Sequence, residues 1–489
     1  MFVGRKRELE ELEKYYKEAS FQFAVFYGRR RVGKTTLIRK FLENKKSIYF
    51  IATETTAKEN LELFSVQILS ALAPEAPRNP FGSFTEAFEY CFKMAEKKRL
   101  ALVIDEYPYL AESDRAVSSI LQAAVDKYKD SSRLFLILCG SSMSFMENQV
   151  LGYKSPLYGR RTCQFKIKPF SYHECAEMLP GFSAEDKIVL YGICGGIPDY
   201  VSRINNNLSV RQNAENLFFN PSGRLFEEPS SLLKQELKSP QTYNGIIAAI
   251  AGGASRVNEI ASKAGIETSQ CSNMLTTLLG LEIVKKESPL LLPSVKPGSK
   301  TKDGLLPGNP SRKSVYRLAD FMFRFWYYFV LPDISRISMG FGKEVCAEIF
   351  EKQVSAKPVS GRKIETYTGL VFEECSAQFL WREMTRKRYK FKDIGRWWGS
   401  NPKEKKEEEI DLVAIDTLGN ILFGECKWRT PCTALEIFDD LIRKSELFPY
   451  FTKKQYIFFS KSGFSPELKK IAAQRKDTVL VGLQEMFFD

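Results

Sequence analysis

The sequence predicts an α/β multidomain protein whose N-terminal part is built on a parallel sheet. A chain of 489 residues is too long for one hydrophobic core and suggests roughly three to four domains. Continuous apolar runs at residues 21–27, 100–105 and 133–139 are typical of parallel strands that helices cover on both faces. A helix–glycine–helix pattern at 257–278 and a new strand-rich segment after 369 indicate that further units follow.

The composition narrows the class of protein. Apolar residues make up 44% of the chain, which is normal for a globular protein. No apolar run is long enough to span a bilayer, and residues 1–8 lack the apolar core of a signal peptide. We therefore expect a soluble cytoplasmic protein with no membrane partner. The net charge of +13 favours a polyanionic partner.

Cysteine and histidine usage argues against several kinds of site. The 10 cysteines are scattered without a Cys-x-x-Cys pair, which indicates a reducing compartment and argues against disulfides or zinc. The single histidine, His173, argues against histidine-based catalysis and against a histidine metal site.

A glycine-rich loop lies between the first strand and the helical pattern at 35–41. It has the spacing G-x-x-x-x-G-K-T of a P-loop, in the strand-then-helix context that the motif requires. Gly28 and Gly33 let the backbone approach phosphate oxygens, and the helix N-terminus faces the anion. Lys34 is expected to reach the β- and γ-phosphates of ATP, and Thr35 to ligate Mg²⁺. The loop residues are Gly28, Arg29, Arg30, Arg31, Val32, Gly33, Lys34, Thr35 and Thr36.

Two later strands end in polar residues that suit the same chemistry. The strand at 100–105 ends in Asp105 and Glu106. Asp105 can hold the hydration shell of Mg²⁺, and Glu106 can position the attacking water. The strand at 133–139 leads into Ser141 and Ser142, which either sense the γ-phosphate or cap the helical segment at 144–150.

Residues outside these strands add candidates for the nucleotide site. Gly4 and Arg5 precede an amphipathic helix that either is an ordinary surface helix or lies over the base. The turn at 195–200 either joins two helices or presses Pro198 on the adenine. Arg160 and Arg161 precede a strand at 163–167, and they are either surface arginines or stabilise phosphoryl charge. That second role would act in cis or from a neighbouring subunit.

Residues 1–232 resemble the archaeal-type ATPases of the AAA+/STAND grouping. The resemblance rests on six motifs in order: Val3-Gly4-Arg5 with Glu8, the P-loop, Ile104-Asp105-Glu106, Cys139-Gly140-Ser141-Ser142, Tyr158-Gly159-Arg160-Arg161 and Gly195-Gly196-x-Pro198. It implies that the first and last of these motifs flank the adenine. It also implies that Asp105 and Glu106 form the Walker B pair and that a helical lid starts near residue 170.

A central segment has the pattern of a winged helix-turn-helix. Two helices within 257–278 are joined at Gly265, and Thr268 can cap the second one. A strand at 282–287, a wing at 293–314 and a return strand at 315–318 complete the pattern. The second helix carries residues that can hydrogen-bond DNA, but it is not basic, so packing and DNA contact stay open as alternatives. The aromatic segment at 320–331 is interpreted as a buried inter-domain helix.

The C-terminal segment has a second cluster of acids. Asp411 lies on a strand at 409–416, and Glu425 and Lys427 share one face of the paired strand at 421–428. Two close carboxylates repel each other, and Mg²⁺ or Mn²⁺ would relieve that repulsion. Lys427 can orient a bound water, and Glu373 can add a ligand from the preceding helix. The alternative is a surface hairpin with scattered charges.

Residues 368–489 resemble the PD-(D/E)XK nuclease fold, and more narrowly the C-terminal domain of unknown function that accompanies archaeal-type ATPases. The acid set Glu373, Asp411, Glu425 and Lys427 carries the resemblance, although Ile410-Asp411 replaces the usual Pro-Asp pair. The resemblance implies a restriction-endonuclease-like α/β domain. The helix expected at 431–444 and the strand at 453–460 suit the order of that core.

These observations predict a P-loop ATPase at 1–232, a winged helix at 233–330, a helical linker at 331–367 and a nuclease-like domain at 368–489. The favoured function is an Mg²⁺-dependent ATPase that acts on DNA through a metal-dependent nuclease domain. The alternatives are a nucleotide-controlled switch or scaffold, which a homo-oligomer would suit, and a transcription regulator. The candidate catalytic residues are Lys34, Asp105, Glu106, Arg160, Glu425 and Lys427. The candidate metal ligands are Thr35, Asp105, Glu373, Asp411 and Glu425, and the candidate nucleotide-binding residues are Gly4, Arg5, residues 28–36, Ser141 and Pro198.

Overall fold

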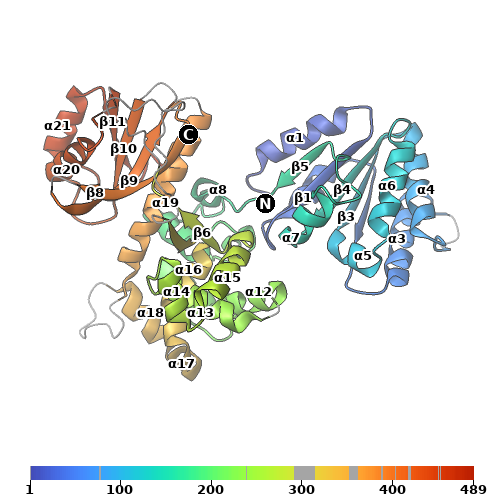
Figure 1. Cartoon of the computed structure of the whole chain (residues 1–489), viewed down its shortest axis with the longest axis horizontal. Coiled ribbons are helices and arrows are strands. Elements are labelled where there is room, and N and C mark those ends of the chain that lie inside the picture. The colour runs from blue at the N-terminus through green and yellow to red at the C-terminus, as the bar shows by residue number, and fades with distance from the viewer. Residues whose placement is uncertain are drawn as a thin grey trace. The chain divides into compact units, whose positions relative to one another are not determined.

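The computed structural model describes residues 2–75, 79–237, 239–290, 314–351, 362–386, 389–401, 404–416, 420–449, 451 and 453–488. The chain folds into two compact units (Figure 1). Unit 1 comprises Met1–Phe170 and Ile197–Asp199, and unit 2 comprises Ser171–Gly196 and Tyr200–Asp489. Among the described residues, none of the helices is both long enough and apolar enough to cross a membrane.

Unit 1 is a parallel sheet covered by helices on both faces. Its strands are β1 (Gln22–Tyr27), β2 (Ser47–Ile51), β3 (Leu100–Asp105), β4 (Leu134–Gly140) and β5 (Cys163–Lys166), in the order β2-β3-β4-β1-β5. All neighbouring strands in it are parallel. Its helices are α1 (Lys6–Lys17), α2 (Lys34–Leu42), α3 (Ala57–Leu72), α4 (Phe84–Lys97), α5 (Tyr107–Ser113), α6 (Val117–Tyr128), α7 (Met143–Phe145) and the wide helical turn η1 (Met146–Val150).

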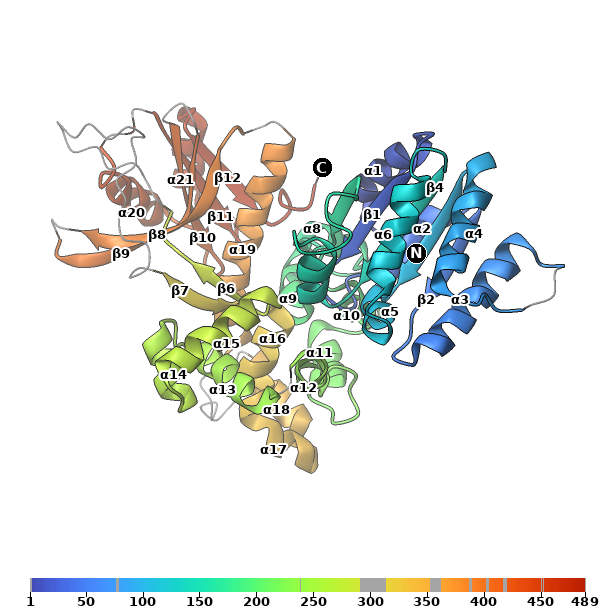
Figure 2. The same ribbon diagram turned by 45° about the vertical axis from the view of Figure 1, so that its right-hand side comes forward.

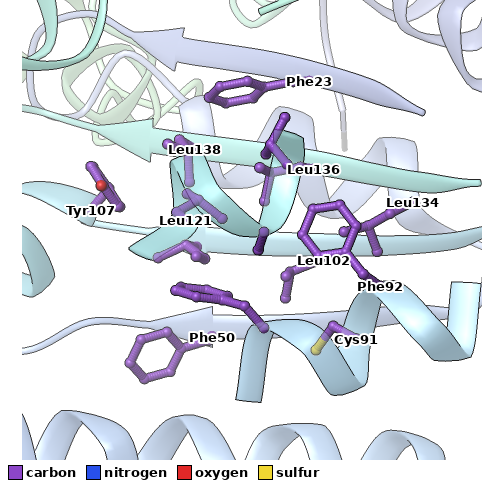
Figure 3. Packing of buried hydrophobic residues seen from close by; sticks show 14 of the residues in the cluster. Phe23, Phe50, Cys91, Phe92, Leu102, Tyr107, Leu121, Leu134, Leu136 and Leu138 are labelled. Atoms are coloured by element: carbon purple, nitrogen blue, oxygen red, sulfur yellow. The ribbon is translucent and has the colours of Figure 1, made fainter. Parts of the chain in front are cut away.

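The core of unit 1 follows from the apolar character of its strands. Every residue of β1, β3 and β4 is buried, as expected for strands covered on both faces. On one face, Phe23, Leu102 and Leu136 pack with residues of α3, α4 and α6 (Figure 3). On the other face, Phe135 contacts the rings of Tyr16 in α1 and Phe41 in α2. This packing fixes the carboxyl ends of the strands at one edge of the sheet.

Unit 2 begins with helices. They are α8 (Tyr172–Glu177), α9 (Ala184–Cys194), α11 (Val210–Phe218), α12 (Glu228–Glu236), α13 (Pro240–Ala251), α14 (Val257–Ala264), α15 (Thr268–Gly280), α16 (Phe321–Phe325), η3 (Trp326–Val330), η4 (Leu331–Asp333), α17 (Ile334–Arg336), η5 (Ile337–Phe341) and α18 (Gly342–Phe350). The short helix α10 (Pro198–Val201) runs from residues of unit 1 into unit 2. Strands β6 (Val284–Glu287) and β7 (Val315–Leu318) form an antiparallel pair.

A mixed sheet forms the C-terminal part of unit 2. It is built from β8 (Asp393–Asn401), β9 (Lys406–Ile415), β10 (Asn420–Lys427), β11 (Lys453–Ser460) and β12 (Thr478–Gly482), in the order β12-β11-β10-β9-β8. Strands β8, β9 and β10 are antiparallel, whereas β10, β11 and β12 are parallel. Helix α19 (Ile364–Thr385) packs on one face, and α20 (Leu435–Ser445) and α21 (Pro466–Gln474) pack on the other (Figure 2).

Several elements predicted from the sequence can be compared with the structure. The strand expected at 453–460 is β11. The aromatic segment at 321–330 is a buried helical stretch, with Arg324 and Tyr328 as its half-buried residues. Gly265 ends α14 in the left-handed conformation, as expected for the turn. The prediction that Thr268 caps α15 is wrong, because the capping position is Glu267 and Thr268 is the first helical residue.

Some expected features lie outside the described residues. These are most of the wing at 293–314, residues 417–419 of the turn expected at 417–420 between the paired strands, and part of the segment at 331–367.

Candidate functional site

The P-loop connects β1 to α2 at the carboxyl edge of the sheet. Gly28 has φ 149°, and a Cβ atom there would lie 2.3 Å from the carbonyl oxygen of Ile167. Gly33 has φ 89° and is the capping residue of α2. Both positions therefore need glycine, one because of a close backbone approach and one because of its left-handed conformation. Arg29, Arg30, Arg31 and Val32 lie in the loop, and Thr36 lies in the first turn of α2.

Lys34 is buried inside this loop. Its side chain is 6% exposed, and Nζ donates hydrogen bonds to the carbonyl oxygens of Gly28 at 2.9 Å and Arg29 at 3.0 Å. Burial lowers the pKa of Lys34 below its usual value, while the charges of Glu106 and Asp105 act to raise it. The ammonium group is thus held within the loop and within electrostatic reach of the two acids.

Thr35 and Asp105 meet, as the strand order predicts. The Thr35 hydroxyl donates to Asp105 Oδ2 at 2.9 Å, and Asp105 is 3% exposed. The hydroxyl of Tyr49 on β2 donates to the same carboxylate oxygen at 2.6 Å. Burial and the charge of Asp105 raise the pKa of Tyr49, so the phenol stays protonated. Tyr49 was not among the predicted site residues, because a tyrosine within a strand gives no signal of such a partner.

Glu106 and Ser141 meet at the ends of β3 and β4. The Ser141 hydroxyl donates to Glu106 Oε2 at 3.0 Å. Glu106 itself has φ 51° and is the capping residue before α5. Ser142 is the capping residue of α7 but makes no side-chain cap bond. The contact with Glu106 brings Ser141 to the edge of the sheet where the P-loop lies.

Arg5 links the N-terminal segment to the P-loop. It donates to the carbonyl oxygens of Val32 at 3.1 Å and Lys168 at 2.6 Å, and it lies over the Phe170 ring at 4.4 Å. Gly4, with φ 67°, precedes it. Pro198 lies beside the same loop, since a Cβ atom on Gly33 would be 3.8 Å from Pro198 Cγ. The expected flanking residues are therefore brought together with the P-loop.

Arg160 does not join this group within the chain. It precedes β5, and β5 pairs with β1 in parallel from Ala24↔Cys163 onward, so Arg160 lies at the amino edge of the sheet. The P-loop follows the opposite end of β1. Two hydrogen bonds, at 2.8 and 2.6 Å, join Arg160 to the Asp126 carboxylate on α6. This position disfavours action in cis and leaves the neighbouring-subunit interpretation open.

The acids of the C-terminal sheet also come together. Leu412 on β9 pairs with Gly424 on β10, so Asp411 and Glu425 are neighbours one position further along. Asp411 Oδ2 accepts a hydrogen bond from the Cys426 backbone at 2.9 Å, and Lys427 pairs with Glu425 Oε1. Glu425 is 7% exposed, and its Oε2 is buried without a hydrogen-bond partner. Burial and the charge of Asp411 raise the pKa of Glu425 above its usual value.

Glu373 lies on α19, within electrostatic reach of Asp411. Burial, reinforced by Asp411, raises the pKa of Glu373 to about 7. Its carboxylate pairs with Arg396 at 2.6 Å, and the same guanidinium also contacts Glu409. Arg396 lies at a register shift between Gly395 and Trp397 of β8, a bulge that redirects its side chain. No pattern along the chain indicated that Arg396 would face this acid.

Within the described ranges, no group of three or more His, Cys, Asp or Glu side chains is arranged to hold a metal ion. Asp411 is within electrostatic reach of both Glu373 and Glu425, but the three carboxylates are not preformed as a three-ligand site. Asp411 and Glu425 are neighbours on adjacent strands, and Lys427 and Lys444 form ion pairs with Glu425.

The nucleotide site defines the class of protein: a P-loop ATPase built on a parallel sheet. A family model of an ATPase domain found predominantly in Archaea matches residues 2–204. A second family model, of archaeal and bacterial proteins of unknown function, matches residues 326–437. An uncharacterised protein of Methanocaldococcus jannaschii is 32% identical over 453 residues, which span 91% of this chain and 92% of that protein. The chain therefore belongs to the same family as this protein.

Other comparisons cover smaller parts or more distant relatives. An ATP-binding protein of M. jannaschii is 63% identical over 46 residues, which are 9% of this chain and 78% of that protein. Among solved structures, the Walker-type ATPase of Pyrococcus abyssi is 18% identical, with a TM-score of 0.48 over 67% of this chain and 96% of that one. A point mutant of RuvB from Thermotoga maritima is 15% identical, with a TM-score of 0.33 over 58% and 90%.

Proposed function

We propose that this ATPase acts on DNA and that its C-terminal sheet is a metal-dependent, nuclease-like domain. The observation that carries the proposal is the pair Asp411 and Glu425 on adjacent strands. The buried Oε2 of Glu425 accepts no hydrogen bond, and the Lys444 ammonium lies 4.0 Å from it. A buried carboxylate oxygen that accepts no hydrogen bond is costly, and a bound cation would offset that cost. Mg²⁺ suits a site with one or two carboxylates because it keeps several waters as ligands.

Each residue has a distinct role in this proposal. Asp411 and Glu425 would hold the ion, and Lys427 would orient water or stabilise charge at the phosphodiester. Glu373 would contribute after leaving Arg396. When bound, the ion would polarise the phosphodiester and lower the pKa of a bound water. The order α19–β8–β9–β10–α20–β11 suits the nuclease resemblance and supports the proposed domain at 368–489.

The DNA partner is supported by charge. The chain carries a net charge of +13. Arg386, Lys390 and Lys392 are exposed in the connection that leads from α19 to β8. Exposed arginines and lysines can contact the phosphates of nucleic acid, and such contacts position the nucleic acid without recognising its base sequence. Helices α13 to α15 with the β6–β7 pair support a winged helix at 233–330, followed by a linker at 331–367.

The same proposal assigns the ATPase residues. Lys34 would contact the β- and γ-phosphates, and Thr35 with Asp105 would hold Mg²⁺. Glu106 would position the attacking water, Ser141 would sense the γ-phosphate, and Arg5 and Pro198 would flank the adenine. The contacts among Thr35, Asp105, Glu106 and Ser141 support these roles.

A plasmid-nicking assay with Mg²⁺ or Mn²⁺, with and without ATP, tests the nuclease proposal. We expect Asp411→Ala and Lys427→Ala each to reduce nicking on the order of a hundredfold or more. Glu407→Ala, an exposed acid on the same strand β9, is the matched control and should nick normally. A Mn²⁺ titration followed by electron paramagnetic resonance should show one weaker site in Asp411→Ala. Undiminished nicking in both variants would point to another nuclease.

A switch or scaffold is the second candidate function. The pairing of Glu373 with Arg396 favours it, because that carboxylate is already neutralised by protein. In this case the C-terminal sheet would bind DNA or a partner without cutting. Slow turnover with retained nucleotide, together with no nicking in any metal, would select this function over the first.

A further inference from the structure

A pocket of about 570 Å³ in unit 2 lies apart from the acids of the C-terminal sheet. Its wall is formed by the end of α13 and the turn after it, by β7, by α16 with η3, and by the start of α19. A hydrogen bond of 2.7 Å from the Tyr316 backbone to Ser255 joins β7 to that turn. The volume is within the range of small-molecule sites, which is about 300–1,000 Å³.

The charges of this wall have one sign. Arg317, Arg324 and Arg362 line the pocket, and no carboxylate is among the described residues that line it. Arg317 also pairs with Glu287 at 3.0 Å, so its charge is partly balanced. Arg324 is the only charged residue in the apolar stretch 321–331. A guanidinium presents its N–H groups in a planar fork that matches two oxygens of a phosphate.

Aromatic rings stand beside these arginines. Arg324 lies over the Tyr367 ring at 5.8 Å, and Arg362 lies over the Tyr328 ring at 5.4 Å. The Tyr367 hydroxyl donates to the carbonyl oxygens of Gly192 and Phe321, which anchors that ring in the wall. Tyr316 and Tyr328 are half-buried and add aromatic surface. These cation–π contacts help to position the guanidinium groups, and aromatic rings also stack well with nucleic acid bases.

We propose that this pocket binds a nucleotide unit, that is, a phosphate ester that carries an aromatic base. The arginines hold the phosphate, and the tyrosines provide the surface for the base. The unit comes either from a free 5′-mononucleotide or from the 5′-phosphorylated end of a DNA strand. The inference does not depend on the proposed nuclease role of Asp411 and Glu425.

Binding to the full chain with the Lys34→Ala substitution tests the proposal. A 5′-monophosphate lacks the β- and γ-phosphates that a P-loop grips, and the substitution weakens that site further. The probes are AMP, inorganic phosphate, and a short DNA strand with either a 5′-phosphate or a 5′-hydroxyl. Calorimetry gives the Kd of each. The added variants are Arg324→Gln, Arg362→Gln and Arg324→Lys, with the exposed Arg224→Gln as a matched control.

We expect AMP or the 5′-phosphorylated strand to bind more tightly than inorganic phosphate and than the 5′-hydroxyl strand. Arg324→Gln and Arg362→Gln should each raise Kd on the order of tenfold or more, because each removes a charged hydrogen bond. Arg224→Gln should leave Kd unchanged. Arg324→Lys keeps the charge but loses the planar guanidinium fork. Its Kd should therefore lie between that of the parent protein and that of Arg324→Gln. Tight AMP binding assigns the free nucleotide, and strand binding alone assigns the DNA end.

Three outcomes would overturn the proposal. The first is that neither AMP nor the 5′-phosphorylated strand binds. The second is that the Kd of the probe that binds is unchanged in both glutamine variants and in Arg324→Lys. The third is that this probe binds no more tightly than its reference, which is inorganic phosphate for AMP and the 5′-hydroxyl strand for the 5′-phosphorylated strand. Thermal melting of each variant separates a lost contact from a lost fold.

Discussion

Asp105 accepts hydrogen bonds from three donors in the nucleotide site. Thr35 and Tyr49 donate to its Oδ2, and the Glu106 backbone donates to its Oδ1 at 3.0 Å. Three donors to one carboxylate fix its orientation. Such preorganisation is what an acid needs if it is to orient the waters of a cation without reorganising during the reaction.

Replacing Tyr49 by phenylalanine tests this orientation. Tyr49→Phe removes one donor to Asp105 and keeps the ring, so the fold should persist. We expect kcat for ATP hydrolysis to fall about tenfold, the equivalent of one hydrogen bond to a charged group. Tyr90→Phe, on α4 and outside the site, is the control. Steady-state kinetics across a Mg²⁺ titration measures the effect, and unchanged kcat would mean that Asp105 needs no such support.

Lys34 permits a second test at the scale of one residue. Lys34→Ala removes the ammonium group that the P-loop encloses, so we expect kcat for ATP hydrolysis to fall on the order of 10²–10³-fold. Lys40→Ala, on the same helix α2, removes only an exposed ion pair with Glu43 and should hydrolyse ATP normally. Phosphate release under saturating ATP measures both. Equal activity of the two variants would contradict the assigned role.

At the scale of elements, the nucleotide site depends on how β1 and β5 run together. Tyr27 pairs with Lys166, and the Ile167 backbone then donates to the Tyr27 carbonyl at 2.8 Å. The chain after β5 therefore runs directly against Gly28. The P-loop takes its shape from this neighbour as well as from its own glycines.

Two glycine substitutions separate the effect of contact from that of backbone conformation. Gly28→Ala places a Cβ atom 2.3 Å from the Ile167 carbonyl oxygen, whereas Gly159→Ala, at φ 76°, meets nothing within 4 Å. We expect Gly159→Ala to cost about 1 kcal/mol of unfolding free energy, the cost of a left-handed alanine. Gly28→Ala should cost about 2 kcal/mol more, because the strand edge must move. Urea unfolding measures both, and equal losses would mean that β5 adapts freely.

At the scale of the whole molecule, Arg160 raises the question of assembly. The Arg160–Asp126 pair lies at the amino edge of the sheet, with Arg160 half-buried and Asp126 exposed, so it contributes at most about 1 kcal/mol to stability. Within one chain, Arg160 and the P-loop lie at opposite edges of the sheet. A role for Arg160 in hydrolysis would therefore require a second copy of the chain.

Mixing two variants tests that role. If Arg160 acts on a neighbouring subunit, Arg160→Ala and Lys34→Ala should each be inactive alone, yet hydrolyse ATP together. In a mixed assembly an intact P-loop from one chain meets an intact Arg160 from the other. Gln164→Ala, exposed on β5, is the control and should stay active alone. Full activity of Arg160→Ala by itself would exclude the arginine from catalysis.

Much of the fold is predictable from the sequence because its signals are local. Continuous apolar runs identified β1, β3 and β4, since only strands buried on both faces have that pattern. The meeting of Thr35 with Asp105 was also predictable, because the carboxyl ends of parallel strands share one edge. The cap of α15 was not, because Thr268 is a favoured capping residue, yet the helix begins one residue earlier and Glu267 caps it without a side-chain hydrogen bond.

The partner of each charged side chain was less predictable. In the sequence, Arg396 is one of several basic residues before two tryptophans, yet in the structure it pairs with Glu373 on a different element. Arg160 was a candidate catalytic residue, yet it pairs with Asp126. Tyr49 has no sequence signal beyond its place in a strand, yet its hydroxyl donates to Asp105.

The sequence by itself determined the P-loop, its strand and helix, and the presence of two groups of acids, because spacing along the chain encodes them. Tertiary structure alone decided which charges meet across elements. Partner choice depends on strand register, on the bulge at Arg396 and on which edge of a sheet a loop reaches, and these are set by packing between segments far apart in the chain.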